Sequence, residues 1–249
     1  MVSTVIIQVY VIYGFIFLLF LFLAIKLLIR SRNRISITLS MVFIIPAIGI
    51  LFNILYRTID DYYFNLIGNK LTIYLSSLAL INIYFFAKII QKSQVGFPLS
   101  RQMTIFLIYA ALLAVLFVIP DGVEFEYEGG IKGIEGYNSR SLDPLDLGVP
   151  VFSTAFFLYG IILSQTVVIV LIFNGVKQYK EIGKSSKFGK KYIMVLSGMI
   201  LMDIVIVSSY LFNWLNKPIG RQISLYLGIC IIPAAILLYL GLKQEKKEL

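Results

Sequence analysis

A single carboxylate stands inside an apolar stretch of the sequence, and it is the residue best placed to do chemistry. Asp203 lies within residues 193–212, which hold no other charged side chain. An ionised aspartate at the centre of a bilayer costs on the order of 2.5–3.5 kcal/mol, and no Lys or Arg lies mid-way along an apolar stretch to pair with it. The sequence therefore predicts that Asp203 is protonated or faces a wet interior pocket. Three roles stay open: a ligand or ion site, a proton-sensitive switch, or a hydrogen bond that only fixes helix packing.

Three further polar side chains are expected near Asp203. At a rise of ~1.5 Å per residue, Asn82, Gln165 and Asp203 fall in the middle third of the bilayer, and Tyr210 lies two helical turns further out on the Asp203 face. We predict that these four residues bind a small ligand of unknown identity. The alternative for Asn82 and Gln165 is ordinary interhelical hydrogen bonding, typically worth about 0.6 kcal/mol per bond.

Several kinds of chemistry are excluded by the composition. Histidine is absent and Cys230 is the one cysteine, so histidine-based catalysis, haem or metal ligation by histidine, an internal disulfide and a thiolate cluster all fail. A retinal protein needs a lysine within the last apolar stretch, and an intramembrane aspartyl protease needs a second carboxylate; neither is present. We therefore expect no enzymatic activity, no cofactor and no metal.

These residues must be positioned by membrane-spanning helices. The chain is 59% hydrophobic with a mean hydropathy of +0.90, and a bilayer core of about 30 Å requires roughly 20 apolar residues of helix. We predict an all-α integral membrane protein with one domain, residues 1–249, built as a bundle of seven transmembrane helices. The predicted spans are residues 5–29, 35–56, 71–90, 103–119, 150–173, 193–212 and 223–242.

The charges divide between the two sides of the predicted bilayer. The cytoplasmic side receives 16 of the 22 Lys and Arg residues, whereas 9 of the 13 Asp and Glu residues fall outside. Short loops rich in Lys and Arg stay in the cytoplasm, so we predict an external N-terminus, a cytoplasmic C-terminus and a multi-pass protein of the cell (plasma) membrane. The net charge of +9 collects in loops at one membrane face, which does not indicate nucleic acid as a partner.

The outer loop 120–148 differs from the others in being long and acidic. Residues 123–128 alternate apolar and acidic side chains and precede Gly129 and Gly130, a pattern typical of a β-hairpin whose second strand would be 131–134. We predict a small extracellular β-hairpin between the fourth and fifth helices. Its acidic face either captures a ligand or cation or is merely solvated; the residues concerned are Glu124, Glu126 and Glu128.

The inner loop between the fifth and sixth predicted helices is strongly basic. We expect its lysines to contact the lipid bilayer through anionic headgroups on the cytoplasmic side, or else to bind an acidic protein partner. The lysines are Lys177, Lys180, Lys184, Lys187, Lys190 and Lys191.

The last third of the chain, residues 152–242, resembles a known family. Its features are the stretch 155–160 (AFFLYG), the basic end Lys190-Lys191-Tyr192, the opening 196–198 (LSG) of the next helix, and the short turn 213–218 (NWLNKP). In these the chain resembles the seven-transmembrane sensor domain at the N-terminus of prokaryotic histidine kinases. No kinase or cyclase domain follows residue 242, so the resemblance implies a stand-alone sensor module.

Three functions are therefore considered from the sequence. The leading hypothesis is a receptor-like or sensory protein that signals through a separate protein partner in a prokaryotic cell. The first alternative is a structural or accessory subunit of a larger membrane complex. The second alternative is a small proton-coupled transporter that uses Asp203.

Overall fold

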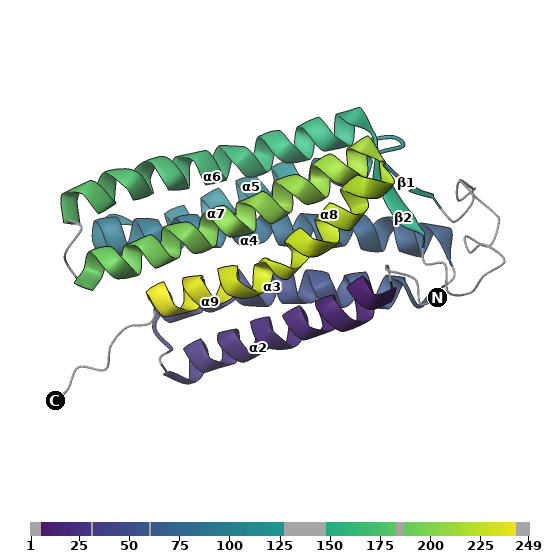
Figure 1. Ribbon diagram of the computed structural model, residues 1–249. Helices are drawn as coiled ribbons and strands as arrows, with labels where there is room; N and C mark the ends of the chain where they lie inside the picture. The colour runs from purple at the N-terminus through teal and green to yellow at the C-terminus, as the bar shows by residue number, and fades with distance from the viewer. Residues whose placement is uncertain (1–5, 31, 60, 127–147, 183–186, 243–249) are drawn as a thin grey trace.

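The computed structural model describes residues 6–30, 32–59, 61–126, 148–182 and 187–242. Over these residues, long helices lie side by side and a short β-ladder sits at one end of the bundle (Figure 1). The elements are η1, a π-helix (Ile7–Ile12), α2 (Tyr13–Arg30), α3 (Arg34–Tyr56), α4 (Tyr62–Gly96), α5 (Leu99–Val118), β1 (Val123–Glu126), β2 (Val149–Phe152), α6 (Thr154–Ile182), α7 (Lys187–Leu215), α8 (Pro218–Ile229) and α9 (Ile231–Leu242).

The helices have the length and composition of membrane spans. Within the described residues, seven helical segments of 20 to 28 residues are apolar enough to cross a bilayer, counting η1 with α2 and α8 with α9. The chain is therefore a multi-pass membrane protein with an all-α bundle, and the sequence prediction is confirmed at that level.

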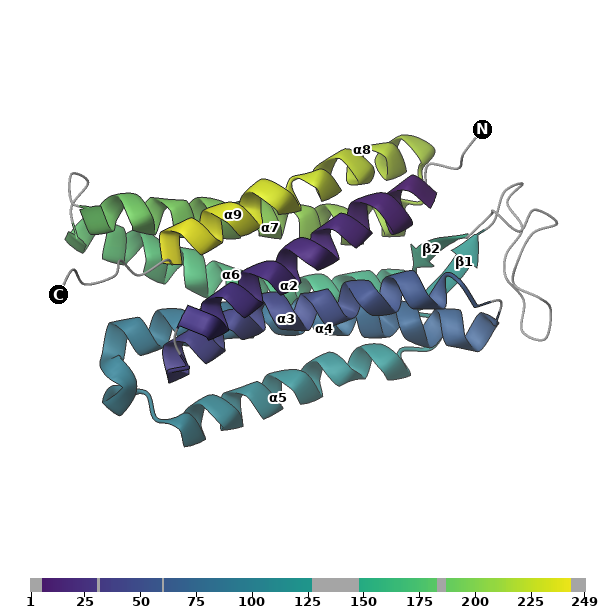
Figure 2. The same ribbon diagram turned by 90° about the horizontal axis from the view of Figure 1, so that it is seen from below.

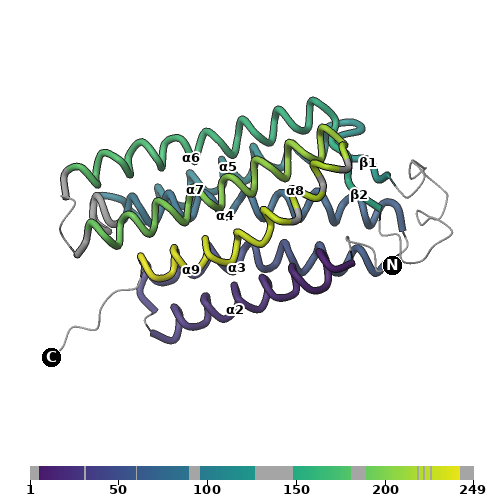
Figure 3. The backbone as a smooth tube through the Cα atoms, viewed as in Figure 1, coloured from purple at the N-terminus to yellow at the C-terminus, as the bar shows by residue number. Residues whose placement is uncertain are grey.

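Successive spans run in opposite directions. Figure 3 shows that η1 begins at the end of the bundle where β1 and β2 lie, and that α9 finishes at the other end. We call these the cap end and the far end. Figure 2 shows α5 at one side of the bundle, beside α4.

The predicted span 150–173 is wrong at its start. Pro150 lies in strand β2, and helix α6 begins only at Thr154. Proline has no backbone N–H to donate, which an edge strand tolerates. The helix begins where Ser153 can cap it, since Ser153 Oγ accepts a hydrogen bond of 3.3 Å from the backbone N–H of Phe156.

Helix caps also move the ends of other spans. Helix α4 begins nine residues before the predicted position 71, because Asp61 caps it by accepting a 2.6 Å hydrogen bond from the backbone N–H of Phe64.

The last predicted span, 223–242, is divided into α8 and α9 at Cys230. Pro233 has no N–H for the carbonyl of Ile229 four residues earlier, which explains a break here.

Strand β1 lies within the first strand of the predicted hairpin. Strand β1 pairs antiparallel with β2, with Val123 opposite Phe152 and Glu126 opposite Val149. The predicted turn at Gly129-Gly130 and the predicted second strand, 131–134, lie outside the described residues. The described partner of β1 is β2, and three of its four residues, 150–152, fall in the predicted helix 150–173.

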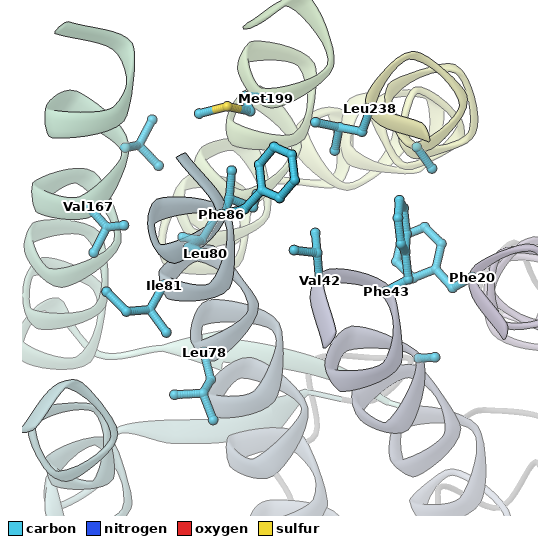
Figure 4. Packing of buried hydrophobic residues seen from close by; sticks show 14 of the residues in the cluster. Phe20, Val42, Phe43, Leu78, Leu80, Ile81, Phe86, Val167, Met199 and Leu238 are labelled. Atoms are coloured by element: carbon cyan, nitrogen blue, oxygen red, sulfur yellow. The ribbon is translucent and has the colours of Figure 1, made fainter. Parts of the chain in front are cut away.

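The core is a continuous apolar cluster between the helices. Phe20 of α2 and Phe43 of α3 meet edge to face with ring centroids 5.7 Å apart. Figure 4 shows these rings on one side of the cluster, with Phe86 of α4, Met199 of α7 and Leu238 of α9 across from them.

Close helix approach depends on small residues. A Cβ atom at Gly198 of α7 would lie 2.8 Å from the backbone oxygen of Ala234 and 3.0 Å from the backbone nitrogen of Leu238, both in α9. The two backbones therefore meet at Gly198, as is common where membrane helices pack through small residues.

Candidate functional site

Two of the four predicted ligand-binding residues meet in the middle of the bundle. Gln165 of α6 donates a hydrogen bond from Nε2 to Oδ1 of Asp203 in α7, over 2.6 Å. Both side chains are half-buried. The Gln165 amide therefore gives the Asp203 carboxyl group a polar partner in a stretch of the sequence that contains no Lys or Arg.

Asn82 is placed differently from the prediction. Its buried side chain donates from Nδ2 to the backbone oxygen of Leu78, one turn earlier in α4, over 3.3 Å. The Asn82 amide therefore bonds to a carbonyl of its own helix, and it takes no part in the hydrogen bond between Gln165 and Asp203.

Tyr210, the fourth predicted ligand-binding residue, contacts residues of α4 and α6. Its hydroxyl lies 3.4 Å from Oγ of Ser77 in α4, and the hydroxyl of Tyr109 in α5 donates to the backbone oxygen of Ser77, also over 3.4 Å. A Cβ atom at Gly160 of α6 would lie 2.3 Å from Cε1 of the Tyr210 ring. Gly160 therefore makes room for this ring between α6 and α7.

The β-ladder is attached to the cap end of α7. The ring of Phe152 in β2 lies 5.8 Å from that of Tyr210, and Asn216, just after α7, donates from Nδ2 to Oε2 of Glu126 in β1 over 2.7 Å. Trp214 stacks on Phe157 with centroids 4.6 Å apart. Phe157 belongs to α6, so only the first two contacts join the ladder to the end of α7, and we call these two the cap–α7 contacts.

The acidic face predicted for the outer loop is partly described. Glu124 and Glu126 are half-buried and alternate with the buried side chains of Val123 and Phe125, as the sequence pattern predicts for the first strand. Glu126 accepts the bond from Asn216, so its carboxylate holds the ladder in place. Glu128 lies outside the described residues.

Most of the lysine-rich segment predicted as a loop is helical. Helix α6 continues to Ile182 and α7 begins at Lys187, so Lys177 and Lys180 belong to α6, and Lys187, Lys190 and Lys191 belong to α7. Lys184 lies outside the described residues. The hydroxyl of Tyr192 donates to Oε1 of Gln178, which joins the two helices at the far end.

A buried polar cluster at the cap end was missed. We call it the cap-end polar cluster; it comprises Asn53, Tyr56 and Arg57 from the end of α3 and Asn69 and Lys70 from α4. All five are at most 8% exposed. The division of charges between the two membrane sides treats Arg57 and Lys70 as solvent-exposed, so it does not predict this cluster. The sequence signal that does indicate it is the spacing of Asn53 and Tyr56, which places both on one helix face.

The two basic residues of this cluster bind backbone carbonyls. Arg57 donates from Nη1 to the oxygen of Gly148, beside β2, and its guanidinium lies 5.1 Å from the Tyr56 ring and 5.5 Å from the Phe125 ring. Lys70 donates from Nζ to the oxygens of Phe117 and Ile119, over 3.1 and 3.4 Å. Arg57 therefore attaches the ladder to α3, and Lys70 caps the C-terminus of α5.

Side chains able to ligate a metal are not clustered in the part of the chain that the structure describes. There, no group of three or more Asp, Glu or Cys side chains could hold an ion.

The fold and the contacts described above define the class of this protein. Comparison with known proteins finds no family model, no curated protein and no solved structure that matches this chain. The molecule is a multi-pass, helical-bundle membrane protein with a β-ladder attached to one end and a polar pair between α6 and α7.

Proposed function

We propose that this chain is a receptor-like, sensory membrane protein that signals through a separate protein partner. The observation that carries the proposal is the attachment of the β-ladder to α7, through Phe152 on Tyr210 and Asn216 on Glu126. The same helix holds Asp203 in mid-bundle and Lys190 and Lys191 at the far end. A small ligand that binds one arrangement of α7 more tightly than another shifts the population toward that arrangement.

The proposal includes the orientation of the chain in the cell membrane. The cap end faces outside and the lysines face the cytoplasm of the cell membrane, following the positive-inside distribution. There Lys177, Lys180, Lys190 and Lys191 contact anionic headgroups or an acidic partner. The resemblance to the sensor domains of histidine kinases supports this arrangement and belongs to the proposal.

Coupling along α7 is tested by a double-mutant cycle that needs no known ligand. Asp203→Asn keeps an oxygen for Gln165 but removes the carboxyl group, and Phe152→Ala removes the ring on Tyr210. We expect an interaction energy of about 0.5–2 kcal/mol between these two changes. Thermal unfolding followed by the emission of Trp214, the one tryptophan in the sequence, measures it.

A matched pair gives the baseline for that cycle. Phe152→Ala combined with Thr104→Ala, an exposed residue of α5, should be additive within about 0.3–0.5 kcal/mol. If the Asp203 pair is equally additive, α7 does not connect the ladder to mid-bundle and the sensory proposal loses its basis.

An accessory-subunit role is the second candidate, because α5 is poorly covered. Leu107, Ile108 and Val118 of this helix are 62%, 57% and 74% exposed, which suits either lipid or a neighbouring subunit. Purification of the tagged chain in a mild detergent separates the two functions. A stoichiometric set of membrane subunits would favour the subunit and contradict the sensor.

A sensor should instead be recovered with a soluble signalling protein. That protein should be lost when Lys177, Lys180, Lys190 and Lys191 are changed to Gln, and kept in the control Lys217→Gln at the cap end. The transporter alternative predicts coupled uptake into proteoliposomes that Asp203→Asn abolishes.

A further inference from the structure

Two buried asparagines at the cap end meet at one phenol oxygen. Asn53 of α3 and Asn69 of α4 each donate from Nδ2 to the hydroxyl oxygen of Tyr56, both over 3.1 Å. The three side chains are 8%, 4% and 0% exposed, respectively. Because the phenol oxygen accepts two hydrogen bonds, its own proton still requires an acceptor.

Each amide uses only one of its two polar heavy atoms in this way. Within the described residues, Oδ1 of Asn53 and Oδ1 of Asn69 are buried and have no hydrogen-bond partner. Rotating either amide by 180° would let Tyr56 donate to it, but the nitrogen would then take the unpaired position. Two buried polar atoms therefore require partners in every arrangement of the amides, and leaving them without partners is costly.

Tight helix packing keeps these atoms away from solvent. A Cβ atom at Gly68 of α4 would lie 2.6 Å from Cβ of Tyr56, so α3 and α4 are in close contact beside the amides. The ring of Phe125 in β1 also meets the Tyr56 ring edge to face, with centroids 6.3 Å apart. The partner must therefore be a small molecule held inside the protein.

The charges nearby identify the chemistry of that molecule. Arg57 and Lys70 are buried next to Tyr56 and Asn69 in the chain, and two positive charges at this position oppose a bound cation. The amide oxygens require donors and the Tyr56 proton requires an acceptor. Water provides both functions, and buried waters typically make about three hydrogen bonds to otherwise unpaired groups.

We propose that the cap-end polar cluster is a binding site for water between α3 and α4, under the β-ladder. The bound water donates to Oδ1 of Asn53 and Asn69 and accepts the Tyr56 proton. This site is separate from the Gln165–Asp203 pair, and it holds whether or not the chain is a sensor.

Hydroxyl-radical footprinting of the purified full chain tests the proposal directly. Radiolysis of bound water oxidises the side chains beside it, even where bulk solvent does not reach. A phenol ring is intrinsically more reactive than a phenylalanine ring, so each oxidation rate is divided by the rate of the same residue in the denatured chain. We expect this ratio to be clearly higher for Tyr56 than for Phe43 and Phe85, which are equally buried at 0% exposure. An equal ratio for Tyr56 and these two phenylalanines would overturn the proposal, and this comparison needs no variant.

Substitutions give a second, independent measurement. Asn53→Leu with Asn69→Leu should reduce the ratio for Tyr56 to that of Phe43. The control Asn82→Leu removes a buried amide of α4 that serves its own helix and should leave Tyr56 oxidation unchanged. In thermal unfolding, Asn53→Leu and Asn69→Leu should each lower the midpoint and be non-additive; a rise in both midpoints would mean that the cluster is dry.

Discussion

Gly198→Leu should lower the free energy of unfolding by about 1–3 kcal/mol or more, the usual cost of overpacking a tight core. The added side chain would begin 2.8 Å from the backbone oxygen of Ala234, and a backbone atom cannot turn aside as a side chain does. Helices α7 and α9 would have to separate along the whole contact. The midpoint of thermal unfolding in detergent, followed by Trp214 emission, measures the loss.

Gly14→Leu and Gly228→Leu are the matched controls. A Cβ atom at either glycine meets nothing within 4 Å, and leucine is favoured over glycine in a helix by roughly 1 kcal/mol. These variants should be neutral or slightly stabilised. A Gly198→Leu midpoint equal to theirs would mean that α7 and α9 do not meet as described. Adding Leu238→Ala to Gly198→Leu should restore little, because the Ala234 carbonyl remains in the way.

Arg57→Ala should release the β-ladder from the bundle. The substitution removes the hydrogen bond to Gly148 and the contacts of the guanidinium with Tyr56 and Phe125. A hydrogen bond from a charged donor contributes about 1.5–3 kcal/mol. Local opening of the ladder should therefore become about 10- to 100-fold more frequent, at 1.4 kcal/mol for each factor of ten. Hydrogen exchange of the backbone amides of β1 and β2 measures it.

Two further variants serve as controls for the hydrogen exchange of Arg57→Ala. Arg57→Lys retains the positive charge but loses the planar group that stacks on rings, so its exchange should lie between those of the parent and of Arg57→Ala. Arg101→Ala, at an exposed position near the start of α5, should leave the ladder unchanged. Unaltered exchange in Arg57→Ala would show that the cap–α7 contacts alone hold β1 and β2.

The sequence predicted the spans well and their ends poorly, for a physical reason. About 20 apolar residues in a row are required to cross a bilayer, so the middle of each span can be recognised from composition. Ends depend on single capping residues, such as Asp61 and Ser153. Strand β2 was missed because its four apolar residues run into the next helix, and its partner β1 lies more than twenty residues earlier.

The candidate site was predictable only in part. Depth along the helices correctly brought Gln165 and Asp203 together, because two mid-membrane polar groups on neighbouring helices have few other partners. It failed for Asn82, which bonds to Leu78 of its own helix. Depth alone cannot say which way a helix is rotated, and this rotation also decided that Asn53 and Asn69 both meet Tyr56.

The break at Cys230 has a consequence for how the chain enters the membrane. Helices α8 and α9 have 12 residues each, or about 18 Å at 1.5 Å per residue, well short of a 30 Å hydrocarbon core. Neither half can therefore partition into lipid alone during synthesis. The final segment must leave the translocon as a joined pair, with the interrupted backbone carried to the bilayer centre. Within the folded bundle, α9 then packs against α7 at Gly198.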